Sequence, residues 1–278
     1  MQAAGHPLPH GFVRVERGAV TLVADAGQIE AIERLGLLAP GALARTFAQA
    51  GGPAGRARVA ILPLGGSSGR LCLRFVRRGG WIGDWLPGVL TGLSRPLAEL
   101  DVTARLRVAG APVPRPLCVV AERRGARGAS LAVGTAFVEG AVDALHFLET
   151  TPSRDRVLRA ATAAGIAVRS FHDAGGCHAD LHVKNLLLRE NAEQLDAIVI
   201  DLDRARIVRA VSPRARLEEL MRLYRSLVKR RLITRVGPRG CARFFAAYTD
   251  RDRALRRALR AGLPRERLRL ALHALHYR

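Results

Sequence analysis

One stretch limits the possible folds of this chain more than any other: residues 177–185, CHADLHVKN, followed by IDLD at 200–203. In phosphoryl transfer, one carboxylate faces the attacking hydroxyl, while an amide oxygen and a second carboxylate hold magnesium at the nucleotide phosphates. A short loop carries Asp180 and Asn185, and a hairpin of the apolar runs that follow would bring Asp201 back beside them. The spacing therefore predicts a phosphotransferase, with Asp180 as general base and Asn185 and Asp201 as magnesium ligands.

The other polar residues near this stretch allow more than one interpretation. Lys184 lies between the base and the asparagine, where it could contact the γ-phosphate as a catalytic residue or extend into solvent. Asp203 could be a second metal ligand or a loop anchor, and ranks below Asp201. We expect His178 to hydrogen-bond the backbone near Asp201, and His172 to pack at the end of its helix.

Two glycine-rich segments in the first half of the chain require different interpretations. A loop that covers nucleotide phosphates needs two strand lengths between itself and the basic residue that binds the phosphates. Residues 51–57, with Gly51, Gly52 and Gly55, have this distance from Arg74. Residues 65–69 lie too close to Arg74, and we expect them to form a plain hairpin turn.

Arg74 occupies the position where a lysine would usually connect the α- and β-phosphates with a helix glutamate. Glu99, near the start of a predicted helix over 95–109, is its expected partner. A strand-edge arginine on a solvated face is the alternative. Val138, at the end of the last predicted strand, completes the predicted nucleotide-binding residues.

The order of predicted elements indicates an α+β fold of two lobes. Residues 1–139 read as a strand-rich lobe and residues 140–278 as a mostly helical one, with a hinge near Glu139. Apolar residues on one side of helix 95–109 are Leu97, Leu100, Ala104 and Val108. The predicted strands are 13–24, 58–64, 70–75, 117–121, 131–138, 186–188 and 195–200. The other predicted helices are 154–173, capped by Ser153, and 213–229, 239–249, 251–262 and 265–276.

Charge and cysteine content indicate the binding partners and the cellular compartment to expect for the protein. The formal net charge is +21, and residues 204–278 hold 22 basic against 5 acidic residues. Arginine-rich coding bias and an anionic membrane surface are both consistent with this excess, whereas the 5% aromatic content and the lack of a reading motif disfavour nucleic acid. None of the four cysteines has C-x-x-C spacing, so free thiols in a reducing compartment are expected. With neither a signal peptide nor a spanning segment recognisable, the expected location is cytoplasmic or peripheral to a membrane.

The motifs resemble a known family at two levels. The lobes, the motif at 178–185 and Asp201 resemble the protein-kinase-like superfamily, but IDLD replaces D-F-G and no A-P-E segment follows, which favours a small-molecule acceptor. More narrowly, the chain is similar to the 3-deoxy-D-manno-octulosonic acid (Kdo) kinases of the lipopolysaccharide kinase family. The segments that carry this likeness are LRFVRRGG at 73–80, APVPRP at 111–116, HADL at 178–181 and IDLDR at 200–204.

The resemblance implies ATP- and Mg2+-dependent phosphorylation of a Kdo hydroxyl, the 4-hydroxyl, on Kdo–lipid A at the cytoplasmic face of the bacterial inner membrane. Arg77 and Arg78 would then bind the anionic acceptor. Val183-Lys184 and Ala57 depart from the family pattern. The alternatives are a heptose kinase or antibiotic phosphotransferase of the same fold, or a basic membrane-binding pseudokinase. Oligomeric state is left open.

Overall fold

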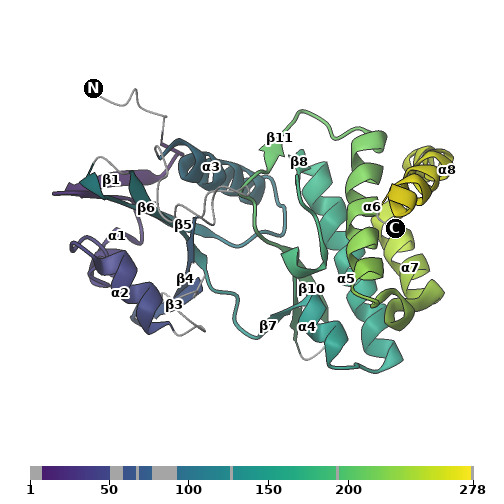
Figure 1. The fold of residues 1–278 in the computed structure, drawn as a ribbon, viewed down its shortest axis with the longest axis horizontal. Helices are drawn as coiled ribbons and strands as arrows, with labels where there is room; N and C mark the ends of the chain where they lie inside the picture. Colours follow the sequence, from purple (N-terminus) through teal and green to yellow (C-terminus); the bar gives the residue numbers. More distant parts are fainter. Residues whose placement is uncertain are drawn as a thin grey trace. The chain divides into compact units, whose positions relative to one another are not determined.

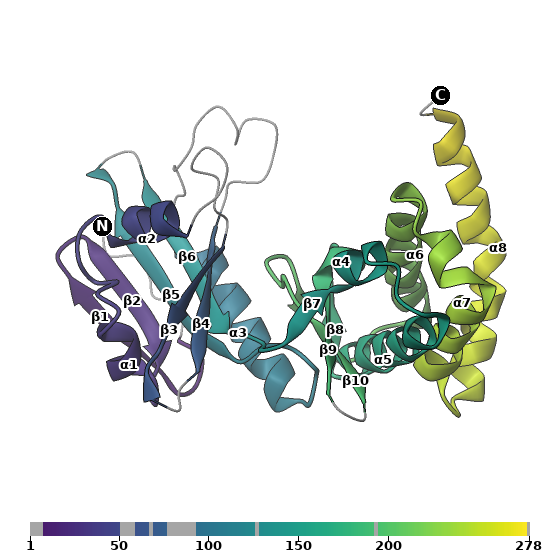
Figure 2. The same ribbon diagram turned by 90° about the horizontal axis from the view of Figure 1, so that it is seen from below.

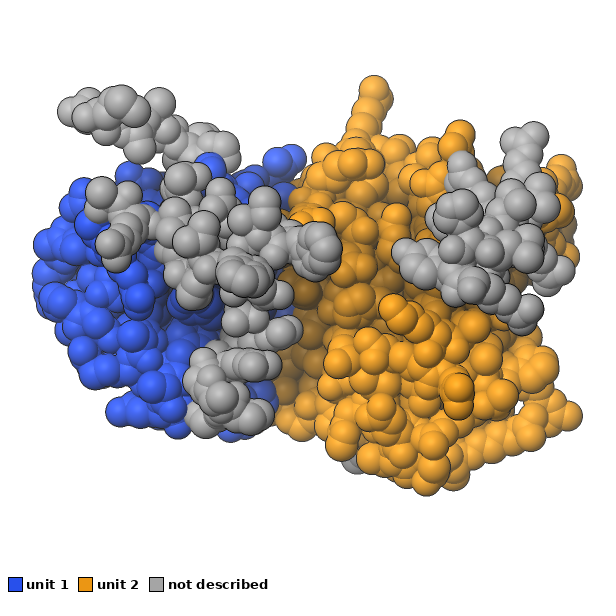
Figure 3. Space-filling model, in the orientation of Figure 1, with its two compact units in different colours: residues 1–105, 114–137 blue, residues 106–113, 138–278 orange. Residues whose placement is uncertain are grey.

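The computed structural model describes residues 8–50, 59–66, 69–76, 93–125, 128–191 and 194–276, with side chains of the last helix described through Pro264. The chain divides into two compact units, which Figure 3 shows in different colours. Unit 1 holds residues 1–105 and 114–137, and unit 2 holds residues 106–113 and 138–278. One unit is rich in strands and the other is mostly helical, so the predicted α+β class is confirmed.

Unit 1 is built on a six-stranded antiparallel sheet of order β1-β2-β5-β6-β4-β3 (Figure 2). Its strands are β1 (Phe12–Arg17), β2 (Val20–Asp25), β3 (Val59–Pro63), β4 (Arg70–Phe75), β5 (Pro116–Arg123) and β6 (Ala129–Ala136). The single strand predicted over 13–24 was wrong, because Gly18 at φ 58° turns the chain and lets Arg17 pair with Val20. The predicted turn at 65–69 does join β3 to β4 as a hairpin.

Helices cover both faces of this sheet because its central strands are apolar on both sides (Figure 1). Leu22 and Ala24 of β2 pack with α1 (Ile29–Glu33) and α2 (Ala42–Gln49). Val23, which points to the opposite face, packs with Leu97 and Leu100 of α3 (Ser94–Val108). The predicted apolar side of α3 was wrong at its end: Val108 is 90% exposed, and Leu106 is buried instead.

Unit 2 combines five helices with short strands among its described residues. The helices are α4 (Ala144–Glu149), α5 (Arg154–Asp173), α6 (Pro213–Lys229), α7 (Ile233–Thr249) and α8 (Arg253–His276). The strands are β7 (Ala141–Asp143), β8 (Gly176–Cys177), β9 (Leu186–Glu190), β10 (Leu195–Val199) and β11 (Arg206–Ile207); β9 lies between β10 and β7, and β8 pairs with β11. The Ser153 hydroxyl accepts a hydrogen bond from the backbone of Arg156, so the predicted cap of α5 is confirmed.

The helices of unit 2 pack closely, and two of them differ from prediction. A Cβ atom at Gly165 of α5 would lie 2.5 Å from the Phe244 carbonyl oxygen of α7, so glycine permits this close approach. Helix α7 consists of two helical pieces joined at a kink at Gly237; the predicted helix over 239–249 is confirmed as the second piece, and the first piece, from Ile233, was not predicted. The two helices predicted over 251–262 and 265–276 are one helix, α8, with Pro264 inside it.

An apolar cavity of about 280 Å³ lies within unit 2. Side chains of all five helices of unit 2 line it, and so do Val183 and Leu186, which flank Asn185. The side of the loop that faces this cavity is therefore apolar, although the loop carries the predicted base. In the part of the chain that is described, no helix is both long and apolar enough to cross a bilayer.

Candidate functional site

The predicted base and metal ligands converge at the start of the β9–β10 hairpin in unit 2. Residues 178–185, the catalytic loop, connect β8 to β9 and end in a single 3₁₀ turn (Val183–Asn185). The hairpin pairs Leu186 with Val199, and the Ile200 backbone N–H donates to the Asn185 carbonyl at 3.0 Å. Asp201, the next residue, is thereby returned beside Asn185, as the spacing predicted.

Asp180 has a fixed backbone and an accessible carboxylate. Its N–H donates to Nδ1 of His178 at 3.2 Å, and its carbonyl accepts from Nδ2 of Asn185 at 3.0 Å. The side chain is 69% exposed, and its Oδ2 lies 3.7 Å from Nε2 of His182. Because the backbone of Asp180 is fixed by these hydrogen bonds and its carboxylate is open to solvent, the carboxylate can contact an incoming hydroxyl group without rearrangement of the loop.

His178 is a structural part of this loop, as predicted. It is 1% exposed, and its Nε2 lies 3.0 Å from the Ile200 carbonyl oxygen, next to Asp201. A carbonyl only accepts and a backbone N–H only donates, so Nε2 carries the proton and Nδ1 accepts from Asp180. Burial lowers the pKa of His178 below its ordinary value of 6.5, which agrees with the neutral ring that this geometry requires.

The donor atoms near the hairpin suit a magnesium ion. The Asn185 side chain is buried, and its nitrogen points to the Asp180 carbonyl, which turns Oδ1 the other way. Asp201 has φ 63°, a left-handed conformation that aspartate tolerates better than most residues. Among the described residues, no three His, Cys, Asp or Glu side chains form a metal cluster. A magnesium ion held by Asn185 and Asp201 would keep several waters, as this ion ordinarily does.

Unit 1 supplies the pair that was predicted for the nucleotide phosphates. Nη2 of Arg74, on β4, lies 2.6 Å from both carboxylate oxygens of Glu99, on α3. Glu99 is 7% exposed and Arg74 28%, so Arg74 is not a strand-edge arginine on a solvated face. The partnership is confirmed, whereas the contact with phosphate stays a prediction.

The structure describes some of the remaining predicted site residues and not others. Lys184 is exposed, Asp203 is half-buried, and Val138 is half-buried with its carbonyl accepting from Ala141 at 3.3 Å. The roles assigned to these three residues remain predictions. The predicted phosphate cover (Gly51, Gly52 and Gly55) and the predicted acceptor ligands (Arg77 and Arg78) lie outside the described residues.

Helix α6 holds the catalytic loop at both ends, which sequence reasoning missed. The His178 N–H donates to Oε2 of Glu219 at 3.0 Å, and the Val183 N–H donates to Oγ of Ser226 at 3.0 Å. Arg222 adds a longer contact, 3.4 Å, to the His178 carbonyl. These three residues are spaced by three and four along the predicted helix 213–229, so a polar stripe on one helical face was the available signal.

Comparisons with known proteins agree with this geometry. Residues 89–248 match the model of the lipopolysaccharide kinase (Kdo/WaaP) family. The chain belongs to this family. It is 33% identical over 164 residues to a 3-deoxy-D-manno-octulosonic acid kinase of Photobacterium profundum, a stretch that covers 57% of this chain and 65% of that relative. A protein of the same description from Actinobacillus succinogenes is 33% identical over 111 residues, or 40% of this chain and 45% of the relative.

A solved structure supports the fold of this lipopolysaccharide kinase family member. The structure described as WaaP in complex with acyl carrier protein has a TM-score of 0.51 at 22% identity, covering 75% of this chain and 81% of that one. Likeness at this level concerns the fold. The sequence matches cover 45% and 65% of the two relatives above, so what those whole proteins do reaches this chain as a proposal.

Proposed function

We propose that this protein is a Kdo kinase that transfers the γ-phosphoryl group of ATP to the 4-hydroxyl of Kdo on Kdo–lipid A. The observation that carries the proposal is the convergence of Asp180, Asn185 and Asp201 at one hairpin, in a chain of the lipopolysaccharide kinase family. Two relatives at 33% identity are described as kinases of this sugar. This arrangement supports phosphoryl transfer, and the relatives support the choice of acceptor.

Each protein group has a distinct task in the proposed reaction. The exposed carboxylate of Asp180 orients the acceptor hydroxyl and takes its proton, while Asn185 and Asp201 would hold magnesium. The metal, when bound, neutralises charge on the phosphate oxygens. Arg74, held by Glu99, adds a fixed positive charge that we assign to the α- and β-phosphates.

We also propose that the protein associates peripherally with the cytoplasmic face of the inner membrane. Lys229, Arg230 and Arg231 are exposed at the end of α6, and Tyr224 and Val228, on the two preceding turns, are 40% and 46% exposed. Basic residues beside exposed apolar ones are suited to an anionic headgroup region. A lipid-linked acceptor would be reached from such a position.

Mass spectrometry of the acceptor after incubation with ATP and magnesium tests the activity. Kdo–lipid A should gain one phosphate with the wild-type protein and none with Asp180→Asn, which keeps the side-chain shape but removes the base. Phosphate on a heptose-bearing acceptor, with none on Kdo–lipid A, would instead identify a heptose kinase. No phosphate on either acceptor, from a folded protein, would refute the proposal.

Vesicle flotation tests the membrane proposal. Binding to vesicles with anionic lipid should fall steeply between low and high salt, and the double charge reversal Arg230→Glu/Arg231→Glu should weaken it. Arg251→Glu/Arg253→Glu, also at exposed positions, is the matched control. Binding that responds neither to salt nor to anionic lipid would contradict a membrane role for this surface.

A further inference from the structure

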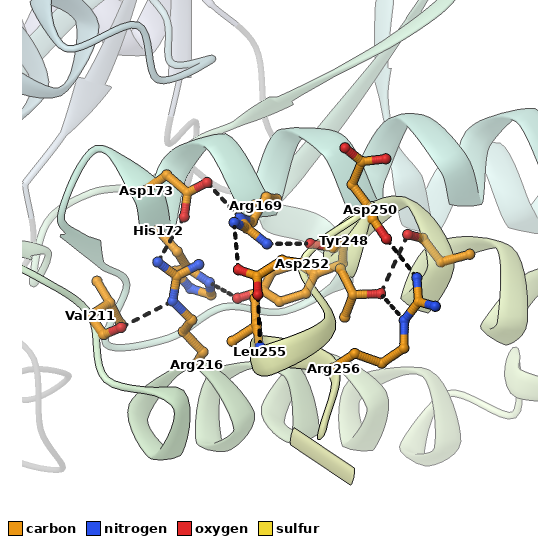
Figure 4. A network of polar contacts seen from close by, with 12 residues as sticks. Arg169, His172, Asp173, Val211, Arg216, Tyr248, Asp250, Asp252, Leu255 and Arg256 are labelled. Atoms are coloured by element: carbon orange, nitrogen blue, oxygen red, sulfur yellow. Dashed lines mark hydrogen bonds and ion pairs between the residues drawn. The ribbon is translucent and has the colours of Figure 1, made fainter. Parts of the chain in front are cut away.

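A buried tyrosine on α7 contacts a buried histidine on α5. Tyr248 and His172 are both 0% exposed, and the tyrosine hydroxyl lies 2.6 Å from Nδ1 of the histidine (Figure 4). Phosphoryl transfer as described above uses neither residue. A hydroxyl group and an imidazole ring that are both removed from water need every hydrogen bond they can make, so this contact constrains both side chains.

The hydrogen bonds around this contact run in one direction. Nε2 of His172 lies 3.1 Å from Oε2 of Glu219, and a carboxylate only accepts, so Nε2 carries the proton. In this tautomer Nδ1 accepts from the Tyr248 hydroxyl. Burial raises the pKa of Tyr248 to about 12, so its hydroxyl keeps the proton that it donates.

The chain of hydrogen bonds ends on the catalytic loop. The same oxygen of Glu219 that accepts from His172 also accepts the His178 N–H at 3.0 Å, two residues before Asp180. We propose that Tyr248 is a positioning residue for Asp180, acting through His172 and Glu219 on the backbone of the catalytic loop. The role assumes that Asp180 is the base of the proposed function.

Neighbouring ion pairs hold the tyrosine in place at the junction of α5 and α7. Arg169 donates to the Tyr248 carbonyl at 3.2 Å, and it contacts Asp173 at 2.5 Å and Asp252 at 3.2 Å (Figure 4). Arg216 contacts Asp173 at 2.7 Å. The Tyr248 hydroxyl therefore contacts His172 from a fixed backbone. A residue that positions another residue must itself be held in this way.

Tyr248→Phe tests the inference because it removes only the hydroxyl. We expect kcat with Kdo–lipid A to fall roughly tenfold, since a small misplacement of a catalytic group is costly, while KM for ATP and acceptor stays unchanged. If the tyrosine acts through the histidine, the double variant Tyr248→Phe/His172→Gln should be no slower than His172→Gln alone. Thr162→Val, which removes a half-buried hydroxyl on α5 that donates to the Leu158 carbonyl at 3.0 Å, is the matched control and should keep wild-type kcat.

A readout that does not depend on activity separates this inference from the proposed function. Backbone hydrogen exchange over residues 178–183 should accelerate in Tyr248→Phe and remain at the wild-type rate in Leu259→Ala, which destabilises unit 2 at a buried α8 position. A wild-type protein without phosphotransfer would refute the proposed function but leave this exchange test valid. Unchanged exchange in Tyr248→Phe, or a kcat loss that Leu259→Ala reproduces at equal thermal destabilisation, would overturn the positioning role.

Discussion

Asn185 performs two tasks with the two ends of one amide, and two substitutions separate them. Asn185→Asp keeps an oxygen for the metal but removes the nitrogen that donates to the Asp180 carbonyl at 3.0 Å. Asn185 is 4% exposed and the hydrogen bond is part-buried, so water replaces the lost donor only in part. Loss of a part-buried hydrogen bond costs about 0.5–1.5 kcal/mol, which should lower Tm by roughly 2–4 °C for a loss near 1 kcal/mol in a protein of this size.

Asn185→Ala removes both groups, so it should show the same loss of stability together with a defect in metal use. Titration of activity with magnesium should shift the half-saturating concentration by about tenfold in Asn185→Ala, equivalent to roughly 1.4 kcal/mol. The Asp variant should retain near wild-type magnesium dependence. An Asp variant as stable as wild type would show that the amide nitrogen does not hold the loop. Unchanged magnesium dependence in the Ala variant would remove Asn185 from the metal site.

Three further predictions follow from the same geometry. Asp180→Ala should lower turnover by about two orders of magnitude or more with Tm unchanged, since the side chain is 69% exposed; retained turnover on Kdo–lipid A would exclude it as the base. Arg74→Ala should raise the nucleotide KM about tenfold, with Arg74→Lys closer to wild type, and unchanged nucleotide kinetics would count against a phosphate contact. The folded-state pKa of His178 lies below 6.5, so on acidification the unfolded chain protonates this ring before the folded protein does. The contribution of the neutral ring to the free energy of unfolding is therefore complete above pH 6.5 and is lost as pH falls below it. Denaturant unfolding of wild type, compared with His178→Gln, should show an extra pH slope approaching about 1.4 kcal/mol per unit below pH 6, and parallel profiles would contradict a buried neutral ring.

Local patterns were sufficient for most elements of the fold. Helix α5 and helix α6 have the predicted bounds; α5 begins at its predicted cap, Ser153, and the structure shows Ser212 capping α6 in the same way. The errors lie where local signals conflict with packing. Pro264 predicted a break, yet α8 continues through it, and the kink at Gly237 falls inside a segment that joins two helices. The exposure of Val108 could not be read from periodicity, because the last turn of the helix buries Leu106 and not the side that Leu97 and Leu100 share.

In the candidate site, too, local sequence signals predicted some features and left others open. The likeness of 178–185 and 200–203 to a phosphotransferase motif identified the candidate base and the candidate metal ligands, and the structure brings them to one hairpin as their spacing predicted. Arg74 and Glu99 were paired from their places on a strand and a helix, and the structure confirms that contact. Lys184 and Val138 carry roles that their positions alone leave open.

The sequence alone therefore indicated which residues are candidates for the chemistry, because a loop, a hairpin and a strand–helix pair are set by short-range spacing. Only the tertiary structure decided what holds them in place. Glu219 and Tyr248 are 41 and 70 residues from His178 along the chain, and they lie near the loop because α7 packs against α5 and α6 packs against the 3₁₀ turn of the loop. Buried hydrogen bonds between distant helices have no periodicity of their own, so the groups that support the catalytic loop appear only once the helices are packed together.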